Sequence, residues 1–176
     1  MTTPGQTVGP FFHYALPYEG GGDLVPPGRA GAIRLHGHVY DGAGDPVPDA
    51  LLELWQADPG GQVPQVGGSL RRDGWTFTGF GRAETDAAGH YSFTTLMPGG
   101  TSPFFAVTVF ARGLTHRLFT RIYPPSARSE ADPFLAGLEP ERRDTLVATP
   151  DEHGLVFDVH LQGDNETVFL TFPGHR

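Results

Sequence analysis

The chain of 176 residues contains no cysteine and no lysine, and no stretch of it is apolar for as long as about 18 residues. Without cysteine, neither a disulfide framework nor a thiolate metal site can form. Without a long apolar run, no segment is expected to cross a membrane. The first residues also lack the basic and apolar regions of a signal peptide, so we expect a cytoplasmic protein.

The balance of charge is acidic. The 12 basic residues, all of them arginine, stand against 20 acidic residues and give a formal net charge of −8. This surplus of negative charge argues against a nucleic-acid partner, because nucleic-acid binding relies on positive patches. Every cationic site in the chain must use the planar fork of a guanidinium.

Glycine and proline are plentiful, with 25 and 17 residues, and they separate short segments in which apolar and polar residues alternate. Alternation of this kind predicts strands, which would cover residues 33–40, 50–56, 90–96, 103–111, 117–123, 155–161 and 168–172. A helical stretch is expected at residues 129–146, in one or two short pieces interrupted by Pro133 and Pro140. About eight short strands with regular turn signals predict an all-β fold, either a β-sandwich or a partly open barrel.

The length fits a single domain over residues 1–176. Residues 1–30 are rich in glycine and proline and lack periodicity, so they are predicted to form an extended arm. Such an arm stays ordered only when it lies on something, and we expect it to pack on a partner chain.

Two features on predicted strands could carry chemistry. His36 and His38 are two residues apart, so their imidazoles face the same way and could share a metal. The competing interpretation is a polar face that they share with Arg34. Glu53 lies inside an apolar strand, and we interpret it as the structural partner of an arginine rather than as a tuned acid.

Two tryptophans are compatible with an alternative function as a binding module. Trp55 and Trp75 could form a flat aromatic platform for carbohydrate, or they could belong to the core or to an interface. The sequence contains no G-x-S-x-G motif, phosphate loop or dinucleotide fingerprint. On the residues alone, a non-catalytic sandwich module that binds carbohydrate or protein therefore remains an alternative to an enzyme.

Five segments together resemble the intradiol ring-cleaving dioxygenases over nearly the whole chain. They read TPGQTVGPFFHYAL, GHVYDGAGDPVPDALLELWQADPGG, FGRAETDAAGHYSFTTLMPG, FARGLTHRLFTRIYPP, and ERRDTLVA followed by FDVHLQGDNETVFLTF. The resemblance implies a β-sandwich enzyme with a mononuclear, non-haem ferric iron held by two tyrosines and two histidines. Enzymes of this family use O2 to open a catecholic ring between its two hydroxyls.

The chain departs from the family at the expected ligand positions. The two histidines are expected where this sequence has Phe104 and Ala106. One tyrosine is expected between the WQAD and FGR segments, but no tyrosine occurs between Tyr40 and Tyr91. The other is expected near Gly100. Phenylalanine and alanine offer no lone pair to a metal, so we predict that this chain binds no iron.

The beginning, the FARG segment and the end of the chain are similar to the iron-free α chains of family members that combine two homologous chains. This likeness implies that a β subunit holds the Fe(III) and that αβ units assemble into a higher oligomer. The reaction it implies converts protocatechuate and O2 to 3-carboxy-cis,cis-muconate. No catalytic residue is then expected in this chain alone.

The same likeness implies that this chain lends residues to the pocket of its partner. These substrate-binding residues would be Thr7, Gly9 and Pro10 of the arm and Arg112 of the FARG segment. A guanidinium at the mouth of the pocket would attract and orient the carboxylate of the substrate.

Overall fold

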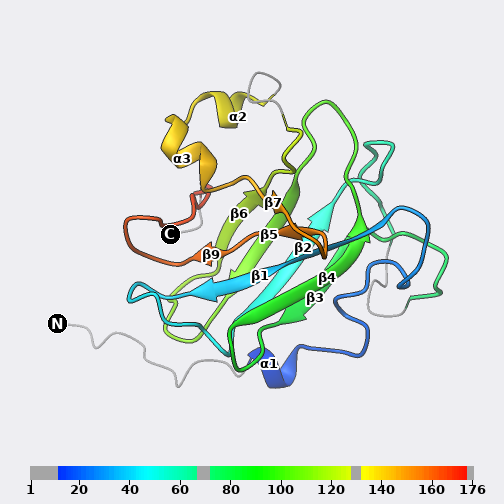
Figure 1. Ribbon diagram of the computed structural model, residues 1–176. Helices are drawn as coiled ribbons and strands as arrows, with labels where there is room; N and C mark the ends of the chain where they lie inside the picture. The colour runs from blue at the N-terminus through cyan, green and yellow to red at the C-terminus, as the bar shows by residue number, and fades with distance from the viewer. Residues whose placement is uncertain (1–11, 67–71, 128–131, 174–176) are drawn as a thin grey trace.

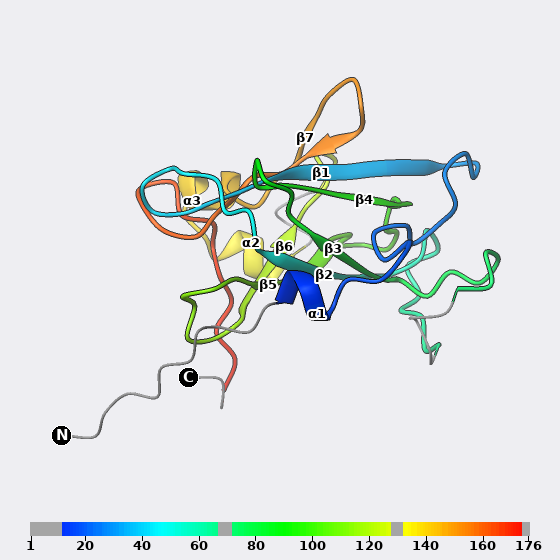
Figure 2. The ribbon, with the colours of Figure 1, turned by 90° about the horizontal axis from the view of Figure 1, so that it is seen from below.

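Two β-sheets stacked face to face make up the fold (Figures 1 and 2). The computed structural model describes residues 12–66, 72–127 and 132–173. One sheet runs in the order β4-β1-β8-β7, with β9 also paired to β1, and the other runs β3-β2-β5-β6. The first sheet contains β1 (Ala32–Tyr40), β4 (His90–Leu96), β7 (Thr149–Pro150), β8 (Leu155–Val156) and β9 (Val159–His160). The second contains β2 (Leu51–Gln56), β3 (Phe80–Glu84), β5 (Phe105–Phe110) and β6 (Leu118–Ile122). The predicted all-β sandwich is confirmed.

The main core lies between the two sheets and follows from the alternation in the sequence. In β5, Phe105, Val107 and Val109 are buried, whereas the residues between them are partly exposed. They meet side chains of the opposite sheet, among them Leu35 and Phe93. Because successive side chains of a strand point to opposite faces, Ala106 and Thr108 face away from this core.

Gly37 allows the centre of the first sheet to pack closely. A Cβ at this position would lie 1.9 Å from the carbonyl oxygen of Phe157. The same oxygen accepts a hydrogen bond of 2.7 Å from the hydroxyl of Tyr91. Burial raises the pKa of Tyr91 well above its usual value, so this hydroxyl remains a donor.

Three short helices lie outside the sheets, namely α1 (Phe12–Ala15), α2 (Pro133–Ala136) and α3 (Pro140–Asp144). The two short helical pieces predicted within residues 129–146 are confirmed as α2 and α3, but Pro133 and Pro140 begin these helices rather than interrupt them. A proline at the first helical position loses no hydrogen bond and already has a helical φ. In Figure 1, α2 and α3 lie next to each other at one end of the sandwich. A small second core of Tyr123, Leu135 and Leu146 lies there.

The strand predictions failed in three places. The sequence analysis missed β3. The segment 155–161 is not one strand but two short ones, β8 and β9. The predicted last strand, residues 168–172, makes only an isolated bridge between Phe119 and Leu170, and Phe172 is 44% exposed. Alternation was therefore not enough, because this segment meets the edge strand β6 at a single bridge and does not continue as a ladder.

Part of the predicted arm packs on its own chain. Leu24 and Val25 are buried, and the N–H of Thr94 donates to the carbonyl of Gly22 at 2.9 Å. At the edge of the other sheet, the N–H of Arg82 on β3 donates to the carbonyl of Gly21 at 2.9 Å. In this part, residues 21–25 therefore link the edges of the two sheets. Among the described residues, no helix has the length and apolar character needed to span a membrane.

Candidate functional site

The positions expected to hold metal ligands meet in one pocket. A cavity of about 360 Å³ is lined by Trp55, Gly100, Thr101, Phe104 and Ala106, among others. In the second sheet, Trp55 lies opposite Ala106 on β5, which lies opposite Arg121 on β6. Residues of β2 and of the start of β5 thus line the pocket, and Arg121 on β6 lies next to them in the sheet.

The side chains in this pocket do not fit a metal ion. Neither Phe104 nor Ala106 has a donor atom, and the guanidinium of Arg121 lies 4.2 Å above the ring of Phe104. Within the three described ranges, no group of three or more His, Asp or Glu side chains is placed to hold a metal ion. A fixed positive charge over an aromatic face, rather than a set of lone pairs, is what the chain offers here.

Asp132 balances the charge of Arg121. One of its carboxylate oxygens lies 3.3 Å from Nη1 of Arg121, and it accepts hydrogen bonds from the hydroxyls of Ser102 at 2.7 Å and Tyr123 at 2.8 Å. The other oxygen accepts from the N–H of Phe134 at 2.8 Å and caps α2. Asp132 therefore joins β6, α2 and the loop before β5.

The titration of this group follows from its contacts. Burial alone raises the pKa of the Asp132 carboxyl, but the hydrogen bonds from Ser102, Tyr123 and Phe134 and the charge of Arg121 outweigh it and hold the pKa below its usual value. Burial raises the pKa of Tyr123 to about 12. At neutral pH, Asp132 and Arg121 therefore form an ion pair, and the hydroxyl of Tyr123 is neutral.

Glu53 pairs with an arginine, as its position in an apolar strand predicted. It lies opposite Arg82 across β2 and β3, and Nε of Arg82 donates to it at 3.0 Å. Nη1 of Arg82 donates to the carbonyl of Leu16 at 2.9 Å. The pair thus also fixes the start of the segment that crosses the sheet edges.

The tryptophans do not form one surface. Trp55 is 43% exposed and packs against Phe80, with ring centroids 4.8 Å apart. Trp75 is 86% exposed and does not line the cavity that contains Trp55.

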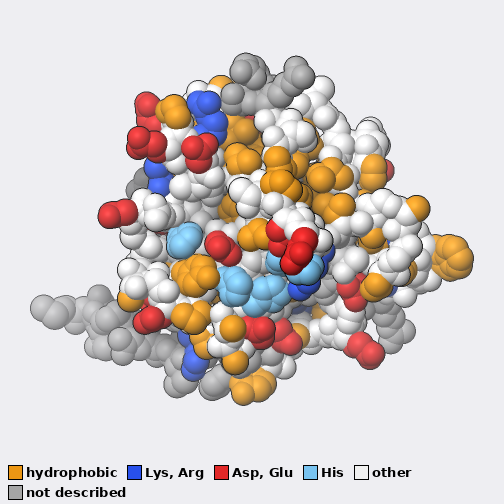
Figure 3. Space-filling model, viewed as in Figure 1, with side chains coloured by type: hydrophobic (Ala, Val, Ile, Leu, Met, Phe, Trp, Pro, Cys, Tyr) orange, Lys and Arg blue, Asp and Glu red, His pale blue; other side chains and the backbone are white. Residues whose placement is uncertain are grey.

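His36 and His38 lie in a row of histidines on the outer face of the first sheet, visible as a pale blue band in Figure 3. His36 shares this face with Arg34, as predicted, and it lies against Asp151. It is only 8% exposed, and its Nε2 lies 3.2 Å from Asp151. The backbone N–H of His38 donates to Asp158 at 2.8 Å.

The sequence analysis missed a third member of this row. His90 lies opposite His38 on β4, and the two rings are 5.1 Å apart. Burial lowers the pKa of His90, and the charge of His38 lowers it further. Only the pairing of β1 with β4 brings these two residues together, so the single strand gave no signal of it.

Arg112 follows the C-terminal end of β5, whereas the pocket lies at the N-terminal end of this strand. The regular strand ends at Phe110, so the shared parity of Phe104, Ala106 and Arg112 does not place the three side chains on one face. Arg112 forms an ion pair with Asp49, in which its own side chain is 48% exposed and that of Asp49 is 9% exposed. Thr7, Gly9 and Pro10 lie outside the described residues.

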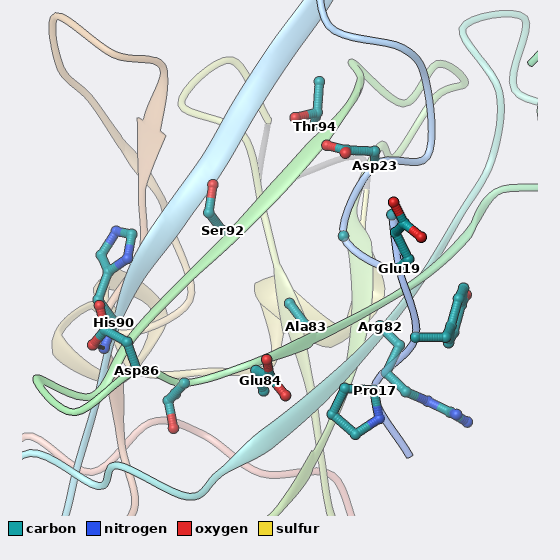
Figure 4. A pocket seen from close by; sticks show the side chains of 15 residues that line it. Pro17, Glu19, Asp23, Arg82, Ala83, Glu84, Asp86, His90, Ser92 and Thr94 are labelled. Carbon is teal, nitrogen blue, oxygen red and sulfur yellow. Dashed lines mark hydrogen bonds between the residues drawn. The ribbon is translucent and has the colours of Figure 1, made fainter. Parts of the chain in front are cut away.

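Another cleft lies elsewhere among the described residues and was not expected from the sequence. It measures about 750 Å³ and opens between residues 17–23 and the edges of β3 and β4. Figure 4 shows Glu19 and Asp23 on the segment and Glu84, Asp86 and His90 on the strand side. Its wide, acidic opening offers no pair of groups arranged for catalysis.

Known proteins similar to this chain carry one consistent description. A family model described as dioxygenase matches residues 21–104. The protocatechuate 3,4-dioxygenase alpha chain of Burkholderia cepacia is 39% identical over an alignment 191 positions long, which covers 96% of each chain. The beta chain from the same organism is 33% identical and covers 77% of this chain and 66% of its own length.

A solved structure supports the same family. The dioxygenase domain of a dioxygenase–carbohydrate-binding fusion protein from Streptomyces sp. SirexAA-E superposes with a TM-score of 0.60, at 28% identity and with 92% of this chain and 98% of that domain covered. The likeness to a full-length relative at 39% identity decides the family. The chain belongs to the intradiol ring-cleaving dioxygenases, as a homologue of the protocatechuate 3,4-dioxygenase alpha chains.

Proposed function

We propose that this chain is the iron-free α subunit of a cytoplasmic, heteromeric protocatechuate 3,4-dioxygenase. The enzyme opens the ring of protocatechuate with O2 and forms 3-carboxy-cis,cis-muconate. The observation that carries the proposal is the pocket in which Gly100, Thr101, Phe104 and Ala106 lie together. An enzyme of this family needs iron, and this pocket contains an arginine–aromatic contact instead of ligands.

The iron is then held by a homologous β subunit. The likeness of this chain to both alpha and beta chains of one organism supports an assembly of two related chains. In such an assembly, homologous surfaces can meet in a pseudo-symmetric interface. Each αβ unit would contain one iron site, in the β chain.

The contribution of this chain to that site comes from two places. Leu16 and the residues after it contact the strands of their own chain, so contact with the partner falls to the arm before Leu16, including Thr7, Gly9 and Pro10. Arg112 is the second contribution. Asp49 orients its guanidinium, and about half of the side chain is left exposed to an approaching carboxylate.

Co-expression of this chain with a homologous β chain tests the proposal. We expect a stable complex that contains one ferric iron per αβ pair and cleaves protocatechuate, whereas this chain purified alone has neither iron nor activity. The iron content is measured on the complex and on each chain after separation. A preparation of this chain alone that carries ferric iron and opens the ring would overturn the proposal.

A further inference from the structure

Two imidazoles lie directly opposite each other on the outer face of the first sheet. His38 on β1 is paired with His90 on β4, and their ring centroids are 5.1 Å apart. The backbone N–H of His38 donates to the carboxylate of Asp158 at 2.8 Å. The backbone N–H of His90 donates to that of Asp86 at 3.0 Å. Because neither N–H group bonds to the opposite residue, this is a non-hydrogen-bonded pair, the type of cross-strand pair in which side chains approach most closely.

The spacing of these rings suits a shared metal ion. A ligating imidazole nitrogen lies roughly 2.0–2.1 Å from Zn²⁺, which prefers tetrahedral coordination. Two imidazoles that bind one such ion therefore have their ring centroids about 5 Å apart, and this is the separation of His38 and His90. Because the pairing of β1 with β4 already holds the two residues in place, binding requires little further ordering of the chain.

Both rings can be reached from solvent. The side chain of His38 is 37% exposed, and His90 is partly exposed and lines the cleft of about 750 Å³. Figure 3 shows the row of histidines at the surface of the molecule. The third member of the row, His36, is not available as a ligand, because its Nε2 is buried and lies 3.2 Å from Asp151. The accessible pair therefore consists of His38 and His90.

Carboxylates beside the pair favour a cation and orient one of the rings. Nδ1 of His38 lies 3.6 Å from the carboxylate of Asp158, which favours the proton on Nδ1 and leaves the lone pair of Nε2 for a metal. A carboxylate behind the imidazole is the usual arrangement at histidine ligands. The charge of Asp86 interacts with both imidazoles. Arg34 is an opposing positive charge, and its Nε donates to Ser92 at 2.9 Å.

We propose that His38 and His90 chelate a divalent transition-metal ion of the kind that imidazole favours, such as Zn²⁺. Water fills the remaining coordination positions, so the ion is exchangeable and links β1 to β4 without being required for folding. The site uses two side chains, which agrees with the absence, within the described residues, of any group of three or more that could hold a metal ion. It is built from residues of this chain and does not rest on the proposed function.

Calorimetric titration with Zn²⁺ tests the inference. The full-length chain is purified without a polyhistidine tag, freed of metal with a chelator and then titrated. We expect a Zn²⁺ site that His38→Gln and His90→Gln each weaken by about tenfold or more, because either change leaves a single imidazole. His116→Gln removes an exposed histidine elsewhere, and His153→Gln removes one whose ring lies beside His36 in the same row. Both of these control variants should keep the affinity of the unmodified chain.

Thermal unfolding gives a second readout. Because the chelate exists only while β1 and β4 are paired, Zn²⁺ should raise the Tm of the unmodified chain with increasing concentration and should have less effect on His38→Gln and His90→Gln. Either variant tests the site if the other does not fold. Mg²⁺ prefers oxygen ligands, so it controls for a general attraction of cations to an acidic chain. An absence of Zn²⁺ binding, equal affinity of the unmodified chain and these two variants, or equally tight binding of Mg²⁺ would overturn the inference.

Discussion

Replacing Asp132 by alanine should be among the most destabilising single substitutions outside the main core. Asp132 is 5% exposed and accepts from Ser102, Tyr123 and Phe134 while it pairs with Arg121. Asp132→Ala removes all four contacts at once. It leaves the guanidinium of Arg121 and the hydroxyls of Ser102 and Tyr123 without this acceptor.

The magnitude follows from the burial of the pair. Removing one partner of a buried ion pair costs about 3–5 kcal/mol. The lower end applies here, because the side chain of Arg121 is 28% exposed and water can partly replace Asp132. For a domain of this size, about 3 kcal/mol corresponds to a fall in Tm of roughly 6–12 °C.

Two further variants divide this loss into its parts. Asp132→Asn keeps a side chain that caps helices as well as aspartate does but removes the charge, so it should fall between the wild type and Asp132→Ala. Ser102→Ala removes one donor and should cost about 1 kcal/mol. Thermal unfolding followed by circular dichroism gives all three values. A fall in Tm of less than about 2 °C for Asp132→Ala would refute the reasoning.

The same group makes a pH prediction. The pKa of Asp132 is lower in the folded protein than the usual value of 3.8 for an aspartate. Its contribution to stability is therefore fully present above the unfolded pKa and is lost as the pH falls through the folded pKa. We expect the Tm difference between wild type and Asp132→Asn to be constant from pH 7 to about 5 and to shrink below about pH 4. A difference that persists undiminished at the lowest pH would contradict the assigned ionisation.

Three further outcomes are expected. In the intact complex, Arg112→Gln should raise KM for protocatechuate by about tenfold or more and leave KM for an uncharged catechol unchanged; equal effects would remove the carboxylate-steering role. Deleting residues 1–12 should weaken assembly or activity, and a fully active, stable truncation would show the arm to be dispensable. Gly37→Ala should give insoluble or strongly destabilised protein, because its Cβ would lie 1.9 Å from the oxygen of Phe157; Gly137→Ala, with contacts no closer than 3.4 Å, is the matched control and should remain stable.

The parts of the fold that the sequence predicted are those in which each strand carries its own pattern. A strand was predicted at residues 103–111, and β5 lies within that range. A carboxylate inside an apolar strand needs a partner wherever the strand lies, so Glu53 predicted an arginine before Arg82 could be identified. In both cases the physical requirement is local.

The parts that the sequence did not predict depend on pairing between distant segments. β3 is short and contains Gly81, and it becomes a strand because β2 offers it an edge. Asp132 gave no signal in the sequence, because its partner Ser102 lies 30 residues away. His90 joins the row of histidines only through the pairing of β1 and β4. A pattern within one segment contains no information on such contacts.

The pocket has no iron ligands, but hydrogen bonds and an ion pair still hold together the segments beside it. A metal ion with four side-chain ligands stabilises a fold by tying together segments that are far apart in sequence. In this chain, Asp132 ties the loop before β5, strand β6 and helix α2 through Ser102, Arg121 and Phe134. The chain thus contains its own fixed contacts at the position where its relatives are expected to need a cofactor. Its pocket should therefore keep its shape when the assembled enzyme is stripped of iron, whereas a β subunit that relies on the metal should loosen there.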